Sequence, residues 1–482
     1  MRNYSRNGKL GICDFGELTV IETGAFRLGD IRGLYPEEIN EDFVRSFAHA
    51  YVGHHSLSGR IATGRDMRQS SASLHEALNE VLASIGIEVL DMGACPTELG
   101  YFASGQPDVN AAIIVTASHN PSRFNGLKCV LSDGTAMAQD AIGKVAALMQ
   151  SGYQHGSSEG SIRTVDLHSA FVIELQSRFH TDELQQEMLA LNGLNGTALT
   201  LAEAIADEFS LPVTWFREGP GPIPQQGTDP SDPLLAGEMK ANMSTGDYLL
   251  GFAWDGDCDR FVCFDDEGNL VPTYYLIGII AEYFLRLHPG IAIVFDTKLC
   301  WNTLDVIRRY GGQPVAARTG HTFMKSKMQE SGALYGGELS AHHYFGDFYG
   351  CDSGMLAWLT VLKLLKTVEA PIKDLVAESR AEICCTPEVS LPVSEAEEAC
   401  RLLVKTYGEE YLVGSESDGI AFELPGDWRF TARASKTESA LRVNFESRGY
   451  PDALLERGSR VLECLTPMCI RSVAWQDNWR IQ

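Results

Sequence analysis

The sequence predicts an α/β protein whose sheets are mixed but largely parallel, followed by an α+β region at the C-terminal end. Two observations lead to this fold class. Apolar runs of strand length alternate with amphipathic segments, and each run ends in a loop rich in glycine, aspartate, glutamate or serine. Strands that alternate with helices form parallel sheets, because a parallel pair needs a crossover long enough to hold a helix. At 482 residues the chain is too long for one core, so we expect about three or four domains.

Strand-and-loop units repeat this pattern along the chain. In chain order they are the apolar run 111–115 with the loop 116–121, the run 248–254 with the loop 255–260, and the run 333–335 with the loop 336–345. We name these loops the serine loop, the aspartate loop and the histidine loop. Such loops follow the carboxyl ends of strands, which is where open α/β sheets bind their ligands.

Helical and antiparallel segments complete the pattern. Residues 73–85 and 355–368 are amphipathic and are predicted to be helices. Residues 428–431 and 440–445 read as short strands joined by a polar turn, as in an antiparallel α+β domain. The proline- and glycine-rich segment 219–233 is expected to be a long surface loop.

Composition limits the function. The net charge of −25 argues against non-specific nucleic-acid binding, which needs a basic face. An anionic substrate therefore requires locally concentrated arginine and lysine. The twelve cysteines are scattered without paired Cys-x2-Cys units, which favours reduced thiols in the cytoplasm. The longest apolar segment, 274–285, contains Glu282 and is shorter than the roughly 20 residues of a membrane span. We expect a soluble cytoplasmic protein without a secretory signal.

The serine loop has two possible roles. Ser118 follows a buried strand, with His119 and backbone N–H groups beside it, so it is well placed as a nucleophile. Serine also commonly caps the N-terminus of a helix, and the loop alone gives both interpretations about equal weight.

The aspartate loop predicts a metal site. Asp255, Asp257 and Asp259 occupy alternate positions, so in an extended loop their carboxylates converge and need a cation. Hard oxygen ligands suit Mg²⁺. The alternatives are a plain acidic turn and a calcium loop. An EF-hand does not fit, because Arg260 stands at its glycine position and Asp266 at its final glutamate position.

Two further segments suit a phosphorylated sugar. In the histidine loop, Glu338, Ser340 and His342 alternate and offer hydrogen-bonding groups to adjacent hydroxyls, although the same alternation occurs on purely structural edge strands. The segment 433–438, named the arginine loop, offers a phosphate cradle or simply a solvated hairpin turn. Its candidate ligands are Arg433, Ser435, Lys436 and Thr437. Isolated basic residues gain meaning only in combination with these loops: Arg32, Lys128, Lys298 and His321.

The order of five motifs resembles the α-D-phosphohexomutase family. They are Asp-Ile-Arg-Gly at 30–33, Thr-Ala-Ser-His-Asn-Pro at 116–121, Asp-Gly-Asp-x-Asp-Arg at 255–260, Gly-Glu-Leu-Ser-x-His at 337–342 and Arg-x-Ser-x-Thr-Glu at 433–438. The match spans roughly residues 26–447. It is greatest with the family's bacterial phosphomannomutases, particularly along residues 336–354.

The resemblance implies three α/β domains and one α+β domain around a central cleft, each giving one loop to the site. The expected limits are 1–155, 156–268, 269–384 and 385–482. Ser118 is then the phosphate carrier, and the three aspartates hold Mg²⁺ together with an oxygen of the phosphoserine. The histidine loop binds the sugar and the arginine loop the phosphate. Further family positions line the cleft: Arg32, Lys128, Arg260, Lys298 and His321. Of these, Arg32 and Lys128 are the candidates for proton transfer or charge stabilisation, beside His119.

The implied reaction interconverts mannose 1-phosphate and mannose 6-phosphate through phosphoserine and a hexose 1,6-bisphosphate, as in GDP-mannose biosynthesis. The alternatives are a phosphoglucomutase, a dual-specificity mutase, a phosphatase and a non-catalytic sugar-phosphate-binding protein. No nucleic-acid or membrane partner is expected, and both monomer and dimer stay open. The sequence departs from the family at Lys436, usually Asn or Gly, at Ser439, usually Pro, and at the pair 28–29. The tail beyond residue 470 lies outside the resemblance.

Overall fold

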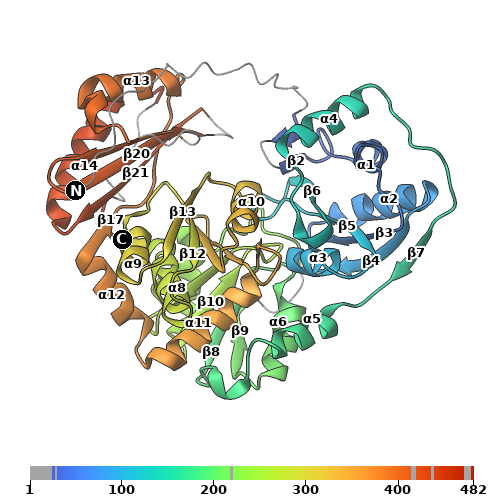
Figure 1. Cartoon of the computed structure of the whole chain (residues 1–482), viewed down its shortest axis with the longest axis horizontal. Coiled ribbons are helices and arrows are strands. Elements are labelled where there is room, and N and C mark those ends of the chain that lie inside the picture. Colours follow the sequence, from blue (N-terminus) through green and yellow to red (C-terminus); the bar gives the residue numbers. More distant parts are fainter. Residues whose placement is uncertain (1–23, 28–29, 218–220, 414–418, 436–438, 472–478) are drawn as a thin grey trace.

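The fold is described from a computed structural model (Figure 1), which places residues 24–27, 30–217, 221–413, 419–435, 439–471 and 479–482. Across these residues the strands form four sheets, with helices packed against them. Figure 1 shows the first region in blue and cyan on the right and the C-terminal region in red at the upper left. The second and third regions lie between and below them. The α/β class with a C-terminal α+β region is confirmed.

The first sheet carries the serine loop. Its strands are β1 (Phe26–Arg27), β2 (Asp30–Leu34), β3 (Arg60–Arg65), β4 (Glu88–Ala94), β5 (Val109–Val115), β6 (Phe124–Leu131) and β7 (Ser161–Thr164). They lie in the order β1-β2-β6-β5-β3-β4-β7, and β3, β4, β5 and β7 run parallel. Because β7 pairs with the open edge of β4, this sheet continues beyond the limit expected at residue 155.

Helices complete the first region. They are α1 (Glu41–His55), α2 (Ser71–Ser84), α3 (Thr97–Ser104) and α4 (Gln139–Gln150). The α1 helix begins after Asn40, whose side-chain oxygen accepts a hydrogen bond from the Phe43 amide at 2.9 Å. The apolar faces of α1, α2 and α4 share one core with the sheet. The helix predicted over 73–85 is α2.

The second sheet carries the aspartate loop. Its strands are β8 (Leu189–Asn192), β9 (Val213–Trp215), β10 (Leu250–Trp254) and β11 (Phe261–Phe264), in the order β11-β10-β8-β9. Its helices are α5 (His168–Gln176), α6 (Ala198–Glu208) and α7 (Pro233–Met243). Here β8 runs parallel to β9 and β10, and β11 returns antiparallel to β10. The aspartate loop is therefore the tight connection between β10 and β11.

The third sheet carries the histidine loop. Its strands are β12 (Ala292–Asp296), β13 (Gln313–Ala317), β14 (Tyr335–Glu338), β15 (His342–Phe345) and β16 (Cys351–Asp352). Its helices are α8 (Thr273–Leu287), α9 (Trp301–Arg309), α10 (His321–Ser331), α11 (Gly354–Val368) and α12 (Ile372–Glu382). The strands follow the order β13-β12-β14-β15-β16, and the helix predicted over 355–368 is α11.

The prediction for the histidine loop was wrong in one respect. Residues 336–345 were expected to form a loop after a strand at 333–335, but β14 continues through Gly336 and Gly337 to Glu338, and β15 follows directly. Helix α8 packs so closely here that a Cβ on Gly337 would lie 2.6 Å from a side-chain carbon of Ile277. The glycines therefore permit close packing in a strand, and the true turn is 339–341.

The fourth sheet is antiparallel. Its strands are β17 (Ile383–Cys385), β18 (Val389–Leu391), β19 (Ile420–Leu424), β20 (Trp428–Ala434) and β21 (Leu441–Arg448), with helices α13 (Ala396–Tyr407) and α14 (Pro451–Leu465). One core continues through the first three regions, whereas the fourth has its own. Glu446 of β21 joins the two cores: its buried carboxylate accepts hydrogen bonds from the Tyr274 hydroxyl at 2.6 Å and the Trp301 amide at 2.9 Å, at the N-terminus of α9.

The C-terminal tail returns to the junction between the third and fourth regions. Trp479 packs against Phe445 with ring centroids 5.3 Å apart. The amide of Gln482 donates to the Cys385 carbonyl at 2.9 Å, and its carbonyl accepts a hydrogen bond from the Tyr275 hydroxyl at 3.3 Å. The last described residues are therefore part of the folded structure, which the sequence did not predict.

Candidate active site

The serine loop connects β5 to β6 and holds Ser118 in a strained conformation. Ser118 is buried and has φ of 49°, in the left-handed region. Its amide donates to Thr116 Oγ1 at 2.8 Å, and its Oγ donates to Asp255 Oδ2 at 2.7 Å. The helix-cap interpretation is wrong, because the element that follows is a strand. The loop turns the hydroxyl toward the aspartate loop instead.

His119 and Arg32 border the serine hydroxyl. The Nδ1 atom of His119 lies 3.2 Å from Ser118 Oγ. Burial, together with the charges of Arg260 and Arg32, holds the pKa of His119 well below its usual value, so the ring is neutral. Arg32 Nη1 donates to the Ala117 carbonyl and to Asn120 Oδ1, both at 3.2 Å. The guanidinium is thereby fixed beside the loop.

Arg68 fixes the backbone of the serine loop through hydrogen bonds to its carbonyl oxygens. Sequence reasoning missed this role. The buried Arg68 guanidinium donates to the carbonyl oxygens of Ser118 at 2.7 Å and Asn120 at 2.6 Å. Asp66 orients it, accepting from Arg68 Nε at 3.0 Å and from Thr116 Oγ1 at 2.8 Å. Asp66 comes directly after strand β3, in the same way that the other functional loops come directly after their strands. This position was the sequence signal that could have indicated a role for Asp66 and Arg68.

The aspartate loop forms a buried acidic cluster. One carboxylate oxygen from each of Asp255, Asp257 and Asp259 lies within 4.8 Å of the others. Lys128 of β6 reaches into it, and its Nζ donates to Asp257 Oδ2 at 2.7 Å and to Asp259 Oδ2. Within the described part of the chain, Asp257 Oδ1 and Asp259 Oδ1 are buried without a hydrogen-bond partner. Unsatisfied oxygens of this kind fit a hard divalent cation such as Mg²⁺.

Charges in this cluster are strongly coupled. Burial raises the pKa of Asp255 well above its usual value, and Asp259 and Asp257 raise it further. Burial alone would raise the pKa of Asp259, but Lys128 and His342 outweigh it and hold that pKa well below its usual value. Burial would lower the pKa of Lys128, yet Asp257 and Asp259 outweigh it and raise that pKa. Lys128 therefore remains an ammonium ion.

The segment expected to be a surface loop is partly buried against the site. Thr228 is fully buried, and its Oγ1 accepts from the Gly256 amide at 2.9 Å. Its amide donates to the His119 carbonyl at 3.1 Å. Gly227 has φ of 100°, and a Cβ there would lie 2.2 Å from the same carbonyl oxygen. This segment thus fastens the serine loop to the aspartate loop, so the expectation of a surface loop is wrong for these residues.

The histidine loop is a tight turn between antiparallel strands rather than an extended segment. Glu338 and His342 pair across β14 and β15, with Ser340 in the turn between them. Ser340 Oγ lies 2.7 Å from His342 Nδ1, and His342 Nε2 lies 3.3 Å from Asp259 Oδ2. The expected convergence of the three side chains is present, but a hairpin turn produces it.

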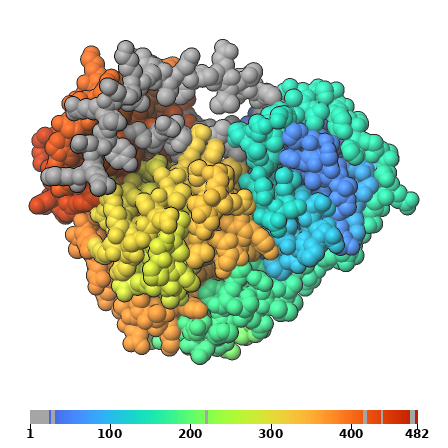
Figure 2. Space-filling model, viewed as in Figure 1, coloured from blue at the N-terminus to red at the C-terminus, as the bar shows by residue number. Residues whose placement is uncertain are grey.

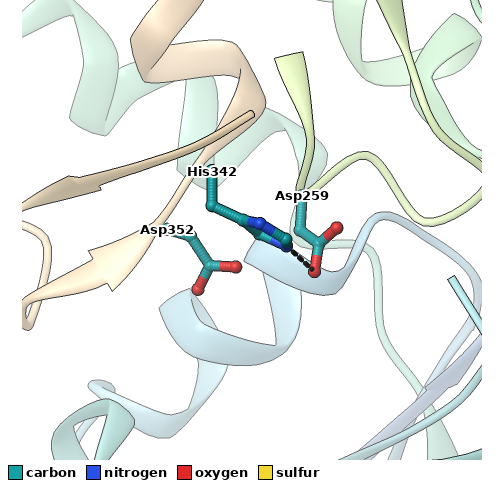
Figure 3. A group of neighbouring side chains, drawn as sticks. All are labelled: Asp259, His342 and Asp352. Carbon is teal, nitrogen blue, oxygen red and sulfur yellow. Dashed lines mark ion pairs between the residues drawn. The ribbon is translucent and has the colours of Figure 1, made fainter. Parts of the chain in front are cut away.

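Figure 3 shows a second group of possible metal ligands, in which His342 and Asp352 lie beside Asp259. Asp352 forms a buried ion pair with Lys325, whose Nζ lies 2.9 Å from its Oδ1. Asp259 belongs to both groups, so this second group connects the histidine loop to the aspartate loop.

The arginine loop lies partly outside the described residues, which exclude Lys436 and Thr437. Arg433 is the second-last residue of β20 and is mostly buried. The Ser435 amide donates to the Ala440 carbonyl at 2.7 Å. Arg442 and Asn444 of β21 line the same cleft as Arg433. Neither residue was predicted to be part of the site.

These loops surround one cleft of about 630 Å³. Figure 2 shows the third region, in yellow and light orange, between the C-terminal region on the left and the first region on the right. The predicted residues in its wall are Arg32, His119, Asp259, Arg260, Lys298, His321, Glu338, Ser340, His342 and Arg433. Ser118, Asp255, Asp257 and Lys128 lie buried just behind this wall. The cleft therefore concentrates cations despite the negative net charge of the chain.

Comparisons with known proteins agree with this fold. The family model described as phosphoglucomutase/phosphomannomutase alpha/beta/alpha domain I matches residues 23–155, and that for domain III matches residues 272–382. A phosphomannomutase from Escherichia coli is 36% identical over 437 residues, which are 88% of this chain and 95% of that protein. The chain belongs to the phosphoglucomutase/phosphomannomutase family. It is a phosphomutase, an isomerase that acts on sugar phosphates.

Other relatives cover the chain equally well. Phosphohexose mutases from Xanthomonas campestris are 35% identical over 90% of this chain and 96% of their own length. A solved structure of a family member from Burkholderia thailandensis superposes with a TM-score of 0.83 at 28% identity, covering 93% of this chain and 98% of that one. The four-domain architecture of the family is thereby confirmed. None of the helices within the described ranges is long and apolar enough to cross a lipid bilayer.

Proposed function

We propose that this phosphomutase interconverts mannose 1-phosphate and mannose 6-phosphate through a phosphorylated Ser118. The hydrogen bond from Ser118 Oγ to Asp255 Oδ2 carries this proposal, because it places the hydroxyl against the acidic cluster. A phosphoryl group on Oγ would then lie where a bound cation neutralises its charge. The relatives named phosphomannomutase support mannose as the sugar.

Each half-reaction transfers one phosphoryl group. The oxygen of the free sugar hydroxyl bonds to phosphorus while the bond from phosphorus to Ser118 Oγ breaks. Its electron pair moves to Oγ, which ends with the proton that the sugar hydroxyl loses. The product is a hexose 1,6-bisphosphate. After this intermediate turns over in the cleft, its other phosphoryl group returns to Ser118 by the reverse step.

Charge stabilisation falls to residues around the serine. Asp255, Asp257 and Asp259 would hold Mg²⁺. When bound, the ion supplies Lewis-acid stabilisation of the transferring phosphoryl group. We assign Arg32 and Lys128 to stabilise the same charge as permanent cations. His119 is neutral and lies within reach of Oγ, so it orients the serine hydroxyl when no phosphate is attached.

Substrate binding uses the remaining loops. Glu338, Ser340 and His342 contact sugar hydroxyls, and the hydroxyls common to both orientations allow binding either way round. Arg433, Ser435, Lys436 and Thr437 hold the phosphate that is not reacting, while Arg260, Lys298 and His321 line the path between. A cleft of about 630 Å³ lies in the usual range for small-ligand sites.

Further parts of the proposal concern context. We infer that the enzyme works in the cytoplasm on small-molecule hexose phosphates and supplies mannose 1-phosphate for GDP-mannose. Every cysteine that the structure describes is a free thiol, which supports a reducing compartment. Hexose 1,6-bisphosphate is the expected activator. We propose that the first domain extends past residue 155 to include β7, and we keep the limits near residues 268 and 384.

A coupled assay tests the sugar assignment. Mannose 1-phosphate and glucose 1-phosphate are compared with and without added hexose 1,6-bisphosphate. The proposal predicts turnover of mannose 1-phosphate that the bisphosphate stimulates. Exclusive turnover of glucose 1-phosphate would favour a phosphoglucomutase, the alternative that the family description also covers. Release of inorganic phosphate instead would indicate a phosphatase.

A further inference from the structure

Glu388 places a carboxylate between the guanidinium groups of Arg433 on β20 and Arg442 on β21. It stands between β17 and β18, and its side chain lines the cleft. Arg433 Nη2 lies 3.3 Å from Glu388 Oε2, and Arg442 Nη1 lies 3.2 Å from Oε1. Asn444 Nδ2 donates to Oε2 at 3.4 Å. Donors from two strands therefore converge on one carboxylate.

Strand register creates this convergence. Arg433 pairs with Arg442 across β20 and β21, and Asn444 lies two residues further along the same face of β21. The edge strand β18 pairs with β21 through Val389 and Val443, which sets Glu388 beside these donors. The sheet thus builds a cradle of guanidinium and amide groups with a carboxylate inside it.

The same donors suit a phosphate. A guanidinium presents parallel N–H groups that match carboxylate and phosphate oxygens alike, so the two anions compete for one set of donors. Arg433 Nε is buried and, in the described ranges, has no hydrogen-bond partner, so further donor capacity remains here. The Glu388 and Arg442 side chains are each 30% exposed, and ion pairs that solvent reaches are weak. Because solvent reaches Glu388, it can leave the cradle when a phosphate takes its place and neutralises the mostly buried Arg433.

We propose that Glu388 is an internal competitor for the phosphate site formed by Arg433, Arg442 and Asn444, and that it sets how tightly the non-reacting phosphate is held. It neutralises the arginines until a phosphate dianion displaces it, and it returns when the phosphate leaves. This weakens retention of the bisphosphate intermediate, which must release one phosphate in order to turn over. The inference rests on the proposed function of Arg433 as a phosphate ligand.

Glu388→Gln tests the inference in the full chain. The amide keeps the size of the side chain but removes the charge that repels a phosphate. Loss of one like charge near a dianion predicts about three- to ten-fold tighter binding of inorganic phosphate by calorimetry. The matched control is Glu397→Gln, the same change on exposed helix α13, which leaves binding unchanged. In an Arg433→Gln background the gain from Glu388→Gln disappears, because the shared site is lost.

A change in phosphate affinity in the opposite direction, or no change, would overturn the inference. Unchanged or weaker phosphate binding in a folded Glu388→Gln protein means that Glu388 positions the arginines or contributes nothing to the site. Thermal melting verifies folding, and Glu388→Ala, which removes the whole side chain, must also tighten binding. The proposed reaction is tested by a different measurement. Absence of mutase turnover in the wild-type chain would contradict the reaction, whereas phosphate binding tests only the role of Glu388.

Discussion

Ser118 and Asp255 lie 137 residues apart in the chain, yet Ser118 Oγ donates to Asp255 Oδ2 at 2.7 Å. This contact joins a loop of the first sheet to a loop of the second. Arg68 holds the serine loop from one side, and Thr228 joins the two loops from the other. The Ser118 hydroxyl is therefore positioned by its surroundings before any substrate enters, which the proposed phosphoryl transfer requires.

Arg68→Lys should disturb this positioning. Lysine keeps the charge but cannot donate to the carbonyl oxygens of Ser118 and Asn120 together. Because buried carbonyl oxygens of the serine loop lose a charged donor, we expect destabilisation of about 1–3 kcal/mol in urea unfolding. A displaced loop predicts a fall in kcat of about 10²-fold with a smaller change in KM. Arg163→Lys, on the exposed strand β7, is the control, and a normal kcat for Arg68→Lys would contradict the positioning role.

Magnesium should stabilise the protein through the aspartate loop. Binding to the folded state alone predicts a rise in the free energy of unfolding of about 2.7 kcal/mol when Mg²⁺ exceeds its Kd a hundred-fold. Asp257→Asn should abolish this stabilisation. The test compares the melting temperature of each protein in Mg²⁺ with the melting temperature of the same protein in EDTA. The exposed control Asp140→Asn should retain it. Activity that survives EDTA, or an equal Mg²⁺ shift in Asp257→Asn, would remove the metal from this loop.

Glu98 should make stability depend on pH. It is fully buried on α3, accepts hydrogen bonds from the Ser353 hydroxyl and the Cys258 thiol, and burial raises its pKa to about 8. A raised pKa means that its stabilising contribution is complete below the unfolded value of 4.5 and is lost as pH rises through about 8. The wild-type chain should therefore lose several kcal/mol relative to Glu98→Gln between about pH 5 and pH 8. Parallel stability curves for the two proteins would contradict this.

Much of the fold was predictable because its strands and helices carry local signals. The apolar runs at 111–115 and 248–254 are β5 and β10, since buried parallel strands need continuous apolar side chains. Gly336 and Gly337 misled the prediction, because a glycine pair normally indicates a turn. Here helix α8 packs so closely that a Cβ at Gly337 would force the Ile277 side chain to move.

The candidate site was predictable only where function concentrates in one loop. Ser118 and the three aspartates stand in short motifs, so their chemistry is visible in the sequence. Arg68, Thr228 and Glu388 act through partners more than 25 residues away, for example Arg68 on Ser118 at a separation of 50. Such roles depend on how the sheets pack together, and no local pattern announces them.

The most direct test of the central claim is to locate the phosphoryl group. The purified chain is incubated with glucose 1,6-bisphosphate and Mg²⁺, and its intact mass and peptides are measured. The account predicts the mass of one added phosphoryl group, located on Ser118, and neither label nor mutase turnover in a folded Ser118→Ala variant. A label on another residue, or turnover that survives in Ser118→Ala, would contradict it.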